Sequence, residues 1–272
     1  MITAQRLGFL WLIVWVGALA AQTKGYSCEE IRGGLYWITD GAYNTMFLVT
    51  SDGVVAVDAP PTLGANYLKA IREVTDKPIR YLIYSHEHTD HIGAASLFPK
   101  SARIIAQEDT AGILKRRTDP RRPIPSIVFR DHYALKTGGE EIHLIYPGPN
   151  HQTGNILIWV LRQKTLMLVD VIYPGYMPYK NLGIVEDVPG YVSVHKTVLG
   201  YDFQTFVGGH VGRLGTRADC RNIPGIRQPT LHGGKRRVDI RALSGVHAIA
   251  SRPRQVGPAQ RIRKGPRRSM CR

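Results

Sequence analysis

Short apolar runs separated by turn residues lie between Gly33 and Asp58. The runs LYWIT, MFLV and VVAV are each four or five residues long, and Ser51-Asp52-Gly53 is one of the turns between them. Runs of this length, bounded by turn residues, are typical of β-strands joined by tight turns. The pattern predicts a meander of three strands in this region.

The spacing of apolar residues then changes from that of a strand to that of a helix. Over Thr62–Val74 the apolar positions recur every three or four residues, and Pro78 prevents the helix from continuing. IRYLIYS then reads as a strand that ends at His86. We predict a helix over Ile92–Phe98, a strand in ARIIAQ, and a helix in EDTAGILKRR.

The second half of the chain repeats this alternation after a proline-rich loop. DPRRPIP, residues 119–125, is predicted to be a surface loop and is a candidate to border the site. The strand-like runs beyond it are EIHLIYPG, NILIWVL, TLMLVDV and FQTFVGG, and a helix is predicted over Pro189–Leu199. Strands in two groups, each accompanied by helices, predict an α/β sandwich of two sheets faced by helices.

Composition supports a globular domain with atypical ends. The 272 residues are 43% hydrophobic, and the three cysteines are too few for a disulfide framework and lack the spacing of a zinc ribbon. The apolar run Leu7–Ala20 follows Arg6 and is too short to span a bilayer, so residues 1–21 are predicted to be a cleaved secretory signal. We therefore expect an exported, periplasmic or secreted protein; a retained N-terminal anchor is the alternative.

The net charge of +15 belongs to the C-terminal segment. Residues 220–272 contain 14 Lys and Arg against the single acid Asp239, whereas the preceding 219 residues carry 22 basic and 20 acidic side chains. The segment has no Phe, Trp or Tyr, so we predict a solvated, disordered tail after a domain over residues 22–219. A second interpretation of this segment, a polyanion-binding arm, is disfavoured because aromatic side chains for base stacking are missing. A third interpretation is that the segment results from a shifted reading frame in the gene.

The strongest chemical signal is His86-Glu87-His88-Thr89-Asp90-His91, which directly follows a predicted strand. Alternate residues of an extended segment project to the same side, so His86 and His88 are placed to share one metal ion. Asp90 and His91 are expected to face a second ion. Candidates for further ligands come at later strand ends: His151, Asp170 and His210.

With these landmarks in this order, and Asp58 at the strand end within VVAVDAP, the sequence resembles the metallo-β-lactamase superfamily over roughly residues 33–215. The resemblance implies an αββα four-layer sandwich with two zinc ions, although the same ligands accept iron or manganese. Family members continue after the last ligand histidine with a helix and a strand, which implies that this C-terminal element is missing or replaced here.

The resemblance also implies a role for each landmark. His86, His88 and His151 would hold one ion, Asp90, His91 and His210 the other, and Asp170 would bridge them. Asp58 would orient a ligand histidine, and Asp90, as the candidate catalytic residue, would also orient the nucleophile.

The expected reaction is hydrolysis of an ester, thioester, lactone or amide by hydroxide generated between the ions. One alternative is a class B β-lactamase, which is disfavoured because Asp170 stands where a thiolate would be expected. Another is a phosphodiesterase or nuclease, which is disfavoured by the predicted export. The third is a non-catalytic metal-binding protein. The expected partner is a small-molecule substrate, with no nucleic acid and no membrane span after signal cleavage; the sequence does not indicate an oligomeric state.

The loop after Asp170 is a candidate substrate-binding segment, because loops that follow ligand-bearing strands commonly line a cleft. Its candidate residues are Tyr176, Lys180 and Asn181, and the turn that contains Tyr43, Asn44 and Met46 is a further candidate. The remaining histidines fit no ligand spacing and are interpreted as ordinary surface or core residues: His132, His143, His195, His232 and His247.

Overall fold

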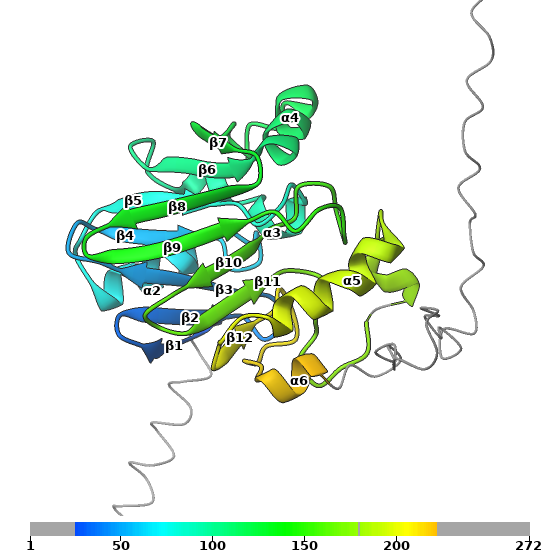
Figure 1. Cartoon of the computed structure of the whole chain (residues 1–272). Helices are drawn as coiled ribbons and strands as arrows, with labels where there is room; N and C mark the ends of the chain where they lie inside the picture. The colour runs from blue at the N-terminus through cyan, green and yellow to red at the C-terminus, as the bar shows by residue number, and fades with distance from the viewer. Residues whose placement is uncertain (1–24, 179, 222–272) are drawn as a thin grey trace, which may run out of the picture.

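Two β-sheets stacked face to face form the centre of the structure, a computed structural model that describes residues 25–178 and 180–221 (Figure 1). The first sheet has the strand order β1-β2-β3-β4-β5-β6-β7, antiparallel from β1 to β4 and parallel from β4 to β7. Its strands are β1 (Ser27–Arg32), β2 (Leu35–Thr39), β3 (Asn44–Val49), β4 (Val54–Val57), β5 (Ile79–Ile83), β6 (Arg103–Gln107) and β7 (Ile127–Phe129).

The second sheet comes from the C-terminal half of the chain and has the order β12-β11-β10-β9-β8. All of its neighbours are antiparallel except β11 and β12, which run parallel. Its strands are β8 (His132–Thr137), β9 (Glu140–Ile145), β10 (Leu157–Val160), β11 (Thr165–Leu168) and β12 (Thr205–Val207).

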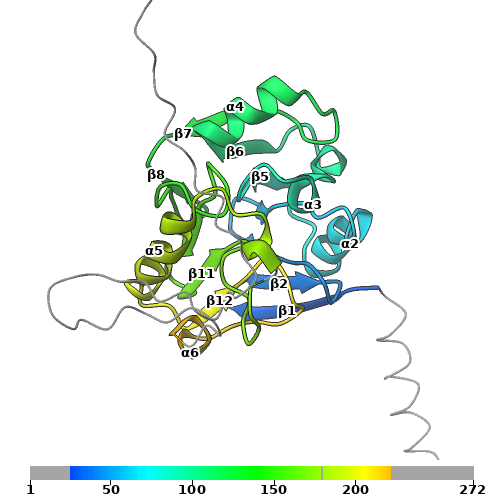
Figure 2. The ribbon, with the colours of Figure 1, turned by 90° about the vertical axis from the view of Figure 1, so that its right-hand side faces the viewer.

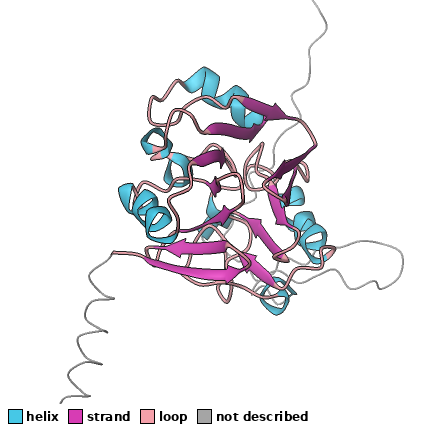
Figure 3. Cartoon of the chain, turned by 90° about the vertical axis from the view of Figure 1, so that its left-hand side faces the viewer, coloured by secondary structure: helices cyan, strands magenta, loops and turns pink. Residues whose placement is uncertain are grey.

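Helices cover the outer faces of both sheets, and Figures 2 and 3 show the layers from opposite sides. Helices α2 and α3 lie on one side of the stacked sheets, and α5 and α6 lie on the other (Figure 2). The described helices are α2 (Ala65–Val74), α3 (Thr89–Ile92), α4 (Glu108–Arg117), α5 (Val188–Leu199) and α6 (Arg217–Arg221), with single turns η1 (Ala95–Leu97) and η2 (Lys180–Gly183). None of these helices is long and apolar enough to cross a membrane.

Three layers of buried side chains hold the four layers of secondary structure together. Val54 and Ala56 of β4 pack toward α2, whereas Val55 and Val57 pack between the two sheets. The same alternation occurs in β11, where Met167 packs between the sheets and its neighbours pack against α5. Strands buried on both faces need apolar residues at every position, which explains the uninterrupted runs VVAV and TLML. The αββα four-layer sandwich predicted from the sequence is confirmed.

Several element boundaries differ from the sequence predictions. The helix predicted over Ile92–Phe98 is wrong, because the structure has the short helix α3 inside the histidine motif and a single turn at Ala95–Leu97. The predicted strands missed β1, β7 and β8, which have many polar or exposed positions. Sheet edges tolerate such positions because one side of an edge strand faces solvent.

The C-terminal boundary at residue 220 also needs correction. Helix α6 runs to Arg221, and Cys220 is fully buried against α5 and the second sheet. The domain therefore extends at least two residues into the segment predicted to be a tail. The predicted signal peptide and the rest of the basic segment lie outside the described residues.

Candidate metal centre

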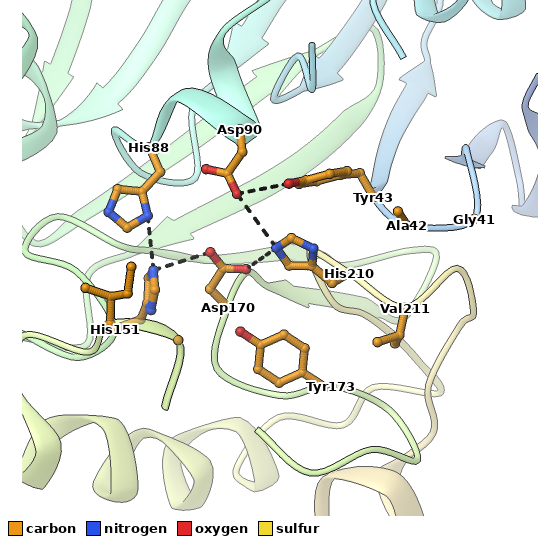
Figure 4. A pocket seen from close by; sticks show the side chains of 12 residues that line it. Gly41, Ala42, Tyr43, His88, Asp90, His151, Asp170, Tyr173, His210 and Val211 are labelled. Atoms are coloured by element: carbon orange, nitrogen blue, oxygen red, sulfur yellow. Dashed lines mark hydrogen bonds and ion pairs between the residues drawn. The ribbon is translucent and has the colours of Figure 1, made fainter. Parts of the chain in front are cut away.

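All seven side chains proposed as metal ligands from the sequence lie in one cluster at the edge shared by the two sheets. Figure 4 shows those that face the pocket: His88, Asp90, His151, Asp170 and His210. They form two groups, and within each group the candidate ligand atoms lie within 4.8 Å of one another. The first group is His86, His88, His151 and Asp170, and the second is Asp90, His91, Asp170 and His210. Asp170 is the only residue common to both groups.

The strand ends of both sheets converge at this cluster. His86 and His88 follow β5, and Asp90 and His91 lie in α3, which continues the same loop. Asp170 and His210 follow β11 and β12, which are parallel neighbours and so deliver their ends to the same edge. The backbones of Tyr43 and His210 form an antiparallel bridge between the sheets, and Asn44 donates from its backbone N–H to the Gly209 carbonyl at 2.9 Å.

The carboxylate of Asp170 lies at the centre of the cluster. Its Oδ2 atom is 3.0 Å from His91 Nε2, 3.3 Å from His151 Nε2 and 3.6 Å from His86 Nε2. Its Oδ1 atom is 3.0 Å from His210 Nε2. Its backbone φ of 60° lies in the left-handed region that non-glycine residues rarely adopt. Such strain concentrates at functional sites.

The donor set fits a pair of transition-metal ions. Among the described residues, the buried Nε2 atom of His86 has no hydrogen-bond partner, although buried polar atoms are normally satisfied. Several imidazole nitrogens face one carboxylate, and this combination of ligands suits zinc and neighbouring divalent metals. A cation in each group would satisfy these nitrogens.

Asp58 orients His86 through an intervening serine. The Asp58 carboxylate accepts hydrogen bonds from the backbone N–H of Ser85 at 2.7 Å and from its hydroxyl at 2.7 Å. The Ser85 Oγ atom lies 3.0 Å from His86 Nδ1. Because the Ser85 hydroxyl proton points to Asp58, its oxygen is left to accept the Nδ1–H of His86, which directs the Nε2 lone pair into the cluster. Burial raises the pKa of Asp58 to about 6.

A buried ion-pair network that the sequence analysis missed holds the histidine motif in place. Glu87, buried within the motif, accepts from Arg117 at 2.9 Å and from Gln152, next to His151, at 3.3 Å. The Arg122 Nη1 atom donates to the Glu87 carbonyl at 2.6 Å and lies 3.3 Å from its carboxylate. Arg122 also pairs with Asp119 at 3.1 Å. The loop predicted to be a surface loop therefore contains a buried arginine that supports the cluster, and its proline-rich composition gave no sign of this.

A pocket of about 630 Å³ opens onto the cluster and has aromatic walls. Tyr43 lies on one side, with its ring centroid 4.5 Å from that of His210 and its hydroxyl 3.4 Å from Asp90 Oδ2. Tyr173 lies on the other side of His210, at 6.0 Å between ring centroids (Figure 4). Ile184, with 81% of its surface exposed, also lines the pocket.

The candidate substrate residues are only partly described. Tyr176 is exposed and is not among the residues that line the pocket, whereas Tyr173, three positions earlier, is. The side chains of Lys180 and Asn181 lie outside the described part of the chain. Of the residues in the second candidate turn, Tyr43 faces the pocket, but Asn44 and Met46 are buried.

Burial and neighbouring charges shift the pKa values of the clustered histidines in different directions. Burial, with the positive charge of neighbouring histidines, holds the pKa of His86 well below its usual range, and burial lowers the pKa of His151 to about 4. Burial alone would also lower the pKa of His91, but nearby carboxylates, Asp170 foremost, raise it to about 9. The surrounding imidazoles outweigh burial and hold the pKa of Asp170 well below its usual range.

Comparison with known proteins identifies similar chains. A model of the metallo-beta-lactamase superfamily matches residues 38–243. The 2,4-dinitroanisole O-demethylase subunit alpha of Nocardioides sp. (strain JS1661) is 33% identical over 196 residues, which cover 70% of this chain and 58% of that protein. This chain therefore matches less than two thirds of that relative's length.

Bacterial metallo-β-lactamases are similar over a comparable region. The type 2 metallo-beta-lactamase of Elizabethkingia meningoseptica is 27% identical over 212 residues, 72% of this chain and 82% of that protein. The structure of a metallo-beta-lactamase from Pontibacter korlensis aligns with a TM-score of 0.62 at 18% identity, covering 72% of this chain and 95% of that one. This structural likeness shows the shared fold.

The Glu87 network predicts different effects for two adjacent arginines. Arg122→Ala should lower the free energy of unfolding by about 2 kcal/mol, because it removes the buried cation paired with Glu87 and leaves Arg117, whose side chain is 60% exposed, as the remaining cation. It should also weaken metal binding by about 10-fold or more. The control is Arg121→Ala, which removes an exposed arginine that contacts Asp119 and should change stability by less than about 0.5 kcal/mol. Chemical denaturation and metal titration measure both effects. Equal effects of the two substitutions would contradict a supporting role for the network.

The raised pKa of His91 predicts a pH dependence of stability in the metal-free protein. Its folded pKa of about 9 exceeds the reference value of 6.5, so the protonated form stabilises the fold below pH 6.5. This stabilisation is lost as the pH rises through 9. Thermal denaturation in the presence of a chelator should therefore show a falling Tm between pH 6.5 and 9.

The zinc-loaded protein provides the control. A metal ligand must be unprotonated, so the same pH rise should leave its Tm unchanged or increase it. Parallel curves for the chelated and the zinc-loaded protein would show that His91 does not meet a metal ion.

Proposed function

Because this chain belongs to the metallo-beta-lactamase superfamily, we propose that it is a hydrolase that uses two zinc ions to cleave an ester, thioester, lactone or amide. The observation that supports this most directly is the position of Asp170 in both ligand groups. A carboxylate shared by two groups suits a pair of ions held close together. When bound, such ions supply Lewis acidity, which lowers the pKa of water and polarises an acyl oxygen.

The chain's own residues divide the work between holding the ions and positioning the reactants. His86, His88 and His151 would hold one ion, and Asp90, His91 and His210 the other, with Asp170 between them. The Asp90 side chain is 44% exposed on the pocket side, where its Oδ2 atom can accept a hydrogen bond from the attacking water. This placement makes Asp90 the residue proposed to orient the nucleophile.

Tyr43 adds a contact that fixes Asp90. Its hydroxyl donates to Asp90 Oδ2, and its own position is set by Asp40, which accepts from the backbone N–H groups of Ala42 and Tyr43 at 2.9 and 2.7 Å. The tight turn therefore holds the backbone of Tyr43 in place beside the pocket. The pocket volume falls within the range of small-molecule sites, which supports a small-molecule substrate.

A β-lactamase is a competing candidate, since relatives of this chain bear that name. The ligand set argues against it, because no cysteine occurs between Cys28 and Cys220 to supply a thiolate. A phosphodiesterase or nuclease would use the same pair of ions on a phosphate ester, and a non-catalytic protein would bind the ions without turning over any substrate.

The relative named 2,4-dinitroanisole O-demethylase favours a second candidate reaction, the hydrolysis of an electron-poor aryl methyl ether. In that reaction water supplies the oxygen of one product and the ether splits into a phenol and methanol. The aromatic walls formed by Tyr43 and Tyr173 suit a planar ring.

Iron or manganese are further metals that the same ligands accept. The proposal also includes export of the protein. Residues 1–21 retain the pattern of a secretory signal. Cell fractionation followed by N-terminal sequencing tests this part. Protein confined to the cytoplasm would contradict export, and an exported chain that starts at Met1 would contradict signal cleavage and support a retained anchor.

Removal of the metal should abolish hydrolysis. Treatment with a chelator should reduce turnover of a panel of thioester, lactone, β-lactam, phosphodiester and aryl ether substrates to background, and added zinc should restore it for the true substrate class. His88→Ala should have the same effect while the circular dichroism spectrum is preserved, because His88 is a candidate ligand that faces the pocket.

The control is Arg121→Ala, which removes a side chain that is 65% exposed and lies outside the pocket, and should keep full activity. Activity retained in the chelated protein or in His88→Ala would rule out the metal-dependent mechanism. Cleavage of β-lactams alone would identify a β-lactamase instead.

A further inference from the structure

A pair of contacting histidines lies on the second sheet, outside the set of residues that line the pocket. The His132 Nε2 atom is 3.2 Å from the His143 Nδ1 atom, and the two rings have centroids 4.9 Å apart. His132 lies on the edge strand β8 and is exposed, and His143 lies on the neighbouring β9 with 28% of its side chain exposed. Neither histidine lines the pocket.

The strand register brings the two histidines together. Ala134 pairs with His143, and His132 pairs with Ile145, so the histidines occupy diagonal positions of an antiparallel pair. Diagonal neighbours on one face of a sheet are within reach of long side chains. The contact therefore follows from the pairing of two ordered strands.

The distance between the two nitrogens suits chelation of one ion. Two imidazole nitrogens at about 2.0–2.1 Å from one zinc ion, with a ligand angle of about 90–110°, lie about 2.9–3.4 Å apart. The same pair of atom types at the same distance occurs in the candidate metal centre, where His151 Nε2 is 3.2 Å from His88 Nδ1.

Glu141 prepares His143 for this role. Its Oε1 atom lies 2.8 Å from His143 Nε2, so the ionised carboxylate accepts the Nε2–H and leaves the lone pair on Nδ1, the atom that faces His132. The hydrogen bond from His143 lowers the pKa of Glu141, which keeps it charged. A carboxylate behind a ligand histidine is the usual second layer of a protein metal site and increases the basicity of the ligand.

We propose that His132 and His143 bind one divalent transition-metal ion such as Zn²⁺, in addition to those of the candidate metal centre. Imidazole ligands favour zinc, nickel and copper over magnesium and calcium, and water completes the coordination on the exposed side. The ion links the edge strand β8 to β9. Because β9 leads into the loop that contains His151, this link also stabilises the start of that loop.

Metal counting on matched variants tests this site. Each protein is dialysed to equilibrium against Zn²⁺ at a concentration that saturates the wild-type chain, and bound zinc is measured per chain. The double variant His132→Asn/His143→Asn should bind one ion fewer than the wild type. Every other metal-binding group is shared by the two proteins, so the difference isolates this pair whether or not the candidate metal centre loads.

Two further variants separate chelation from surface charge. Glu141→Gln keeps the shape but removes the charge, and should weaken the extra ion by about 10-fold or more. Lys136→Asn removes an exposed cation 3.7 Å from Glu141 and should retain the ion or bind it more tightly. An equal zinc content in the double variant and the wild type, or loss of the ion in Lys136→Asn, would overturn the proposal.

Discussion

The buried carboxylate of Asp170 is the constraint on which the rest of the site depends. Only 6% of its side chain is exposed, and four imidazoles lie within 3.6 Å of its two oxygens. An ionised carboxylate is expensive to bury unless positive or hydrogen-bonding groups surround it. The histidines have the complementary problem, because buried imidazoles need a partner for their ring nitrogens. The two sets of groups therefore require each other, and cations between them would satisfy both.

Such a cluster needs a rigid frame, because its groups come from four separate segments of the chain. The backbone bridge to Tyr43 ties the His210 segment to the first sheet. The buried Glu87 ties the histidine motif to Arg122 and, through Gln152, to the loop of His151. Space is equally restricted at Gly209, where a Cβ atom would lie 2.9 Å from the ring of His91 and 3.0 Å from the carboxylate of Asp170. The backbone bridge and the pair of Glu87 with Arg122 thus hold the cluster through contacts that involve no candidate ligand side chain.

Two histidine pairs share the same 3.2 Å distance between ring nitrogens but lie in different surroundings. His88 and His151 come from loops and lie at the pocket, among further imidazoles and a shared carboxylate. His132 and His143 come from neighbouring strands and have a single carboxylate behind one ring. The first setting suits chemistry on a bound molecule, because the pocket gives access. The second suits a structural ion, because it joins two strands.

The sequence alone determined the elements whose residues have a strong period or an unbroken apolar run. Strands such as VVAV and TLML could be predicted because burial on both faces leaves no room for polar residues, and α4 could be predicted over Glu108–Arg117 from its helical spacing. The edge strands and the short α3 could not, since sheet edges and a single helical turn impose little pattern on the residues that form them.

For the site, the order of HEHTDH, His151, Asp170 and His210 resembles that of the metallo-β-lactamase superfamily, and this resemblance selected the candidate ligands. Only the tertiary structure decided what supports them. Ser85 connects Asp58 to His86 through hydrogen bonds. Arg122 contacts Glu87 from a loop 35 residues away, and Tyr43 contacts Asp90 from the turn before β3. These contacts join residues that are distant along the chain and individually ordinary. Pairings of this kind depend on how the two sheets stack, and a local sequence pattern does not encode that stacking.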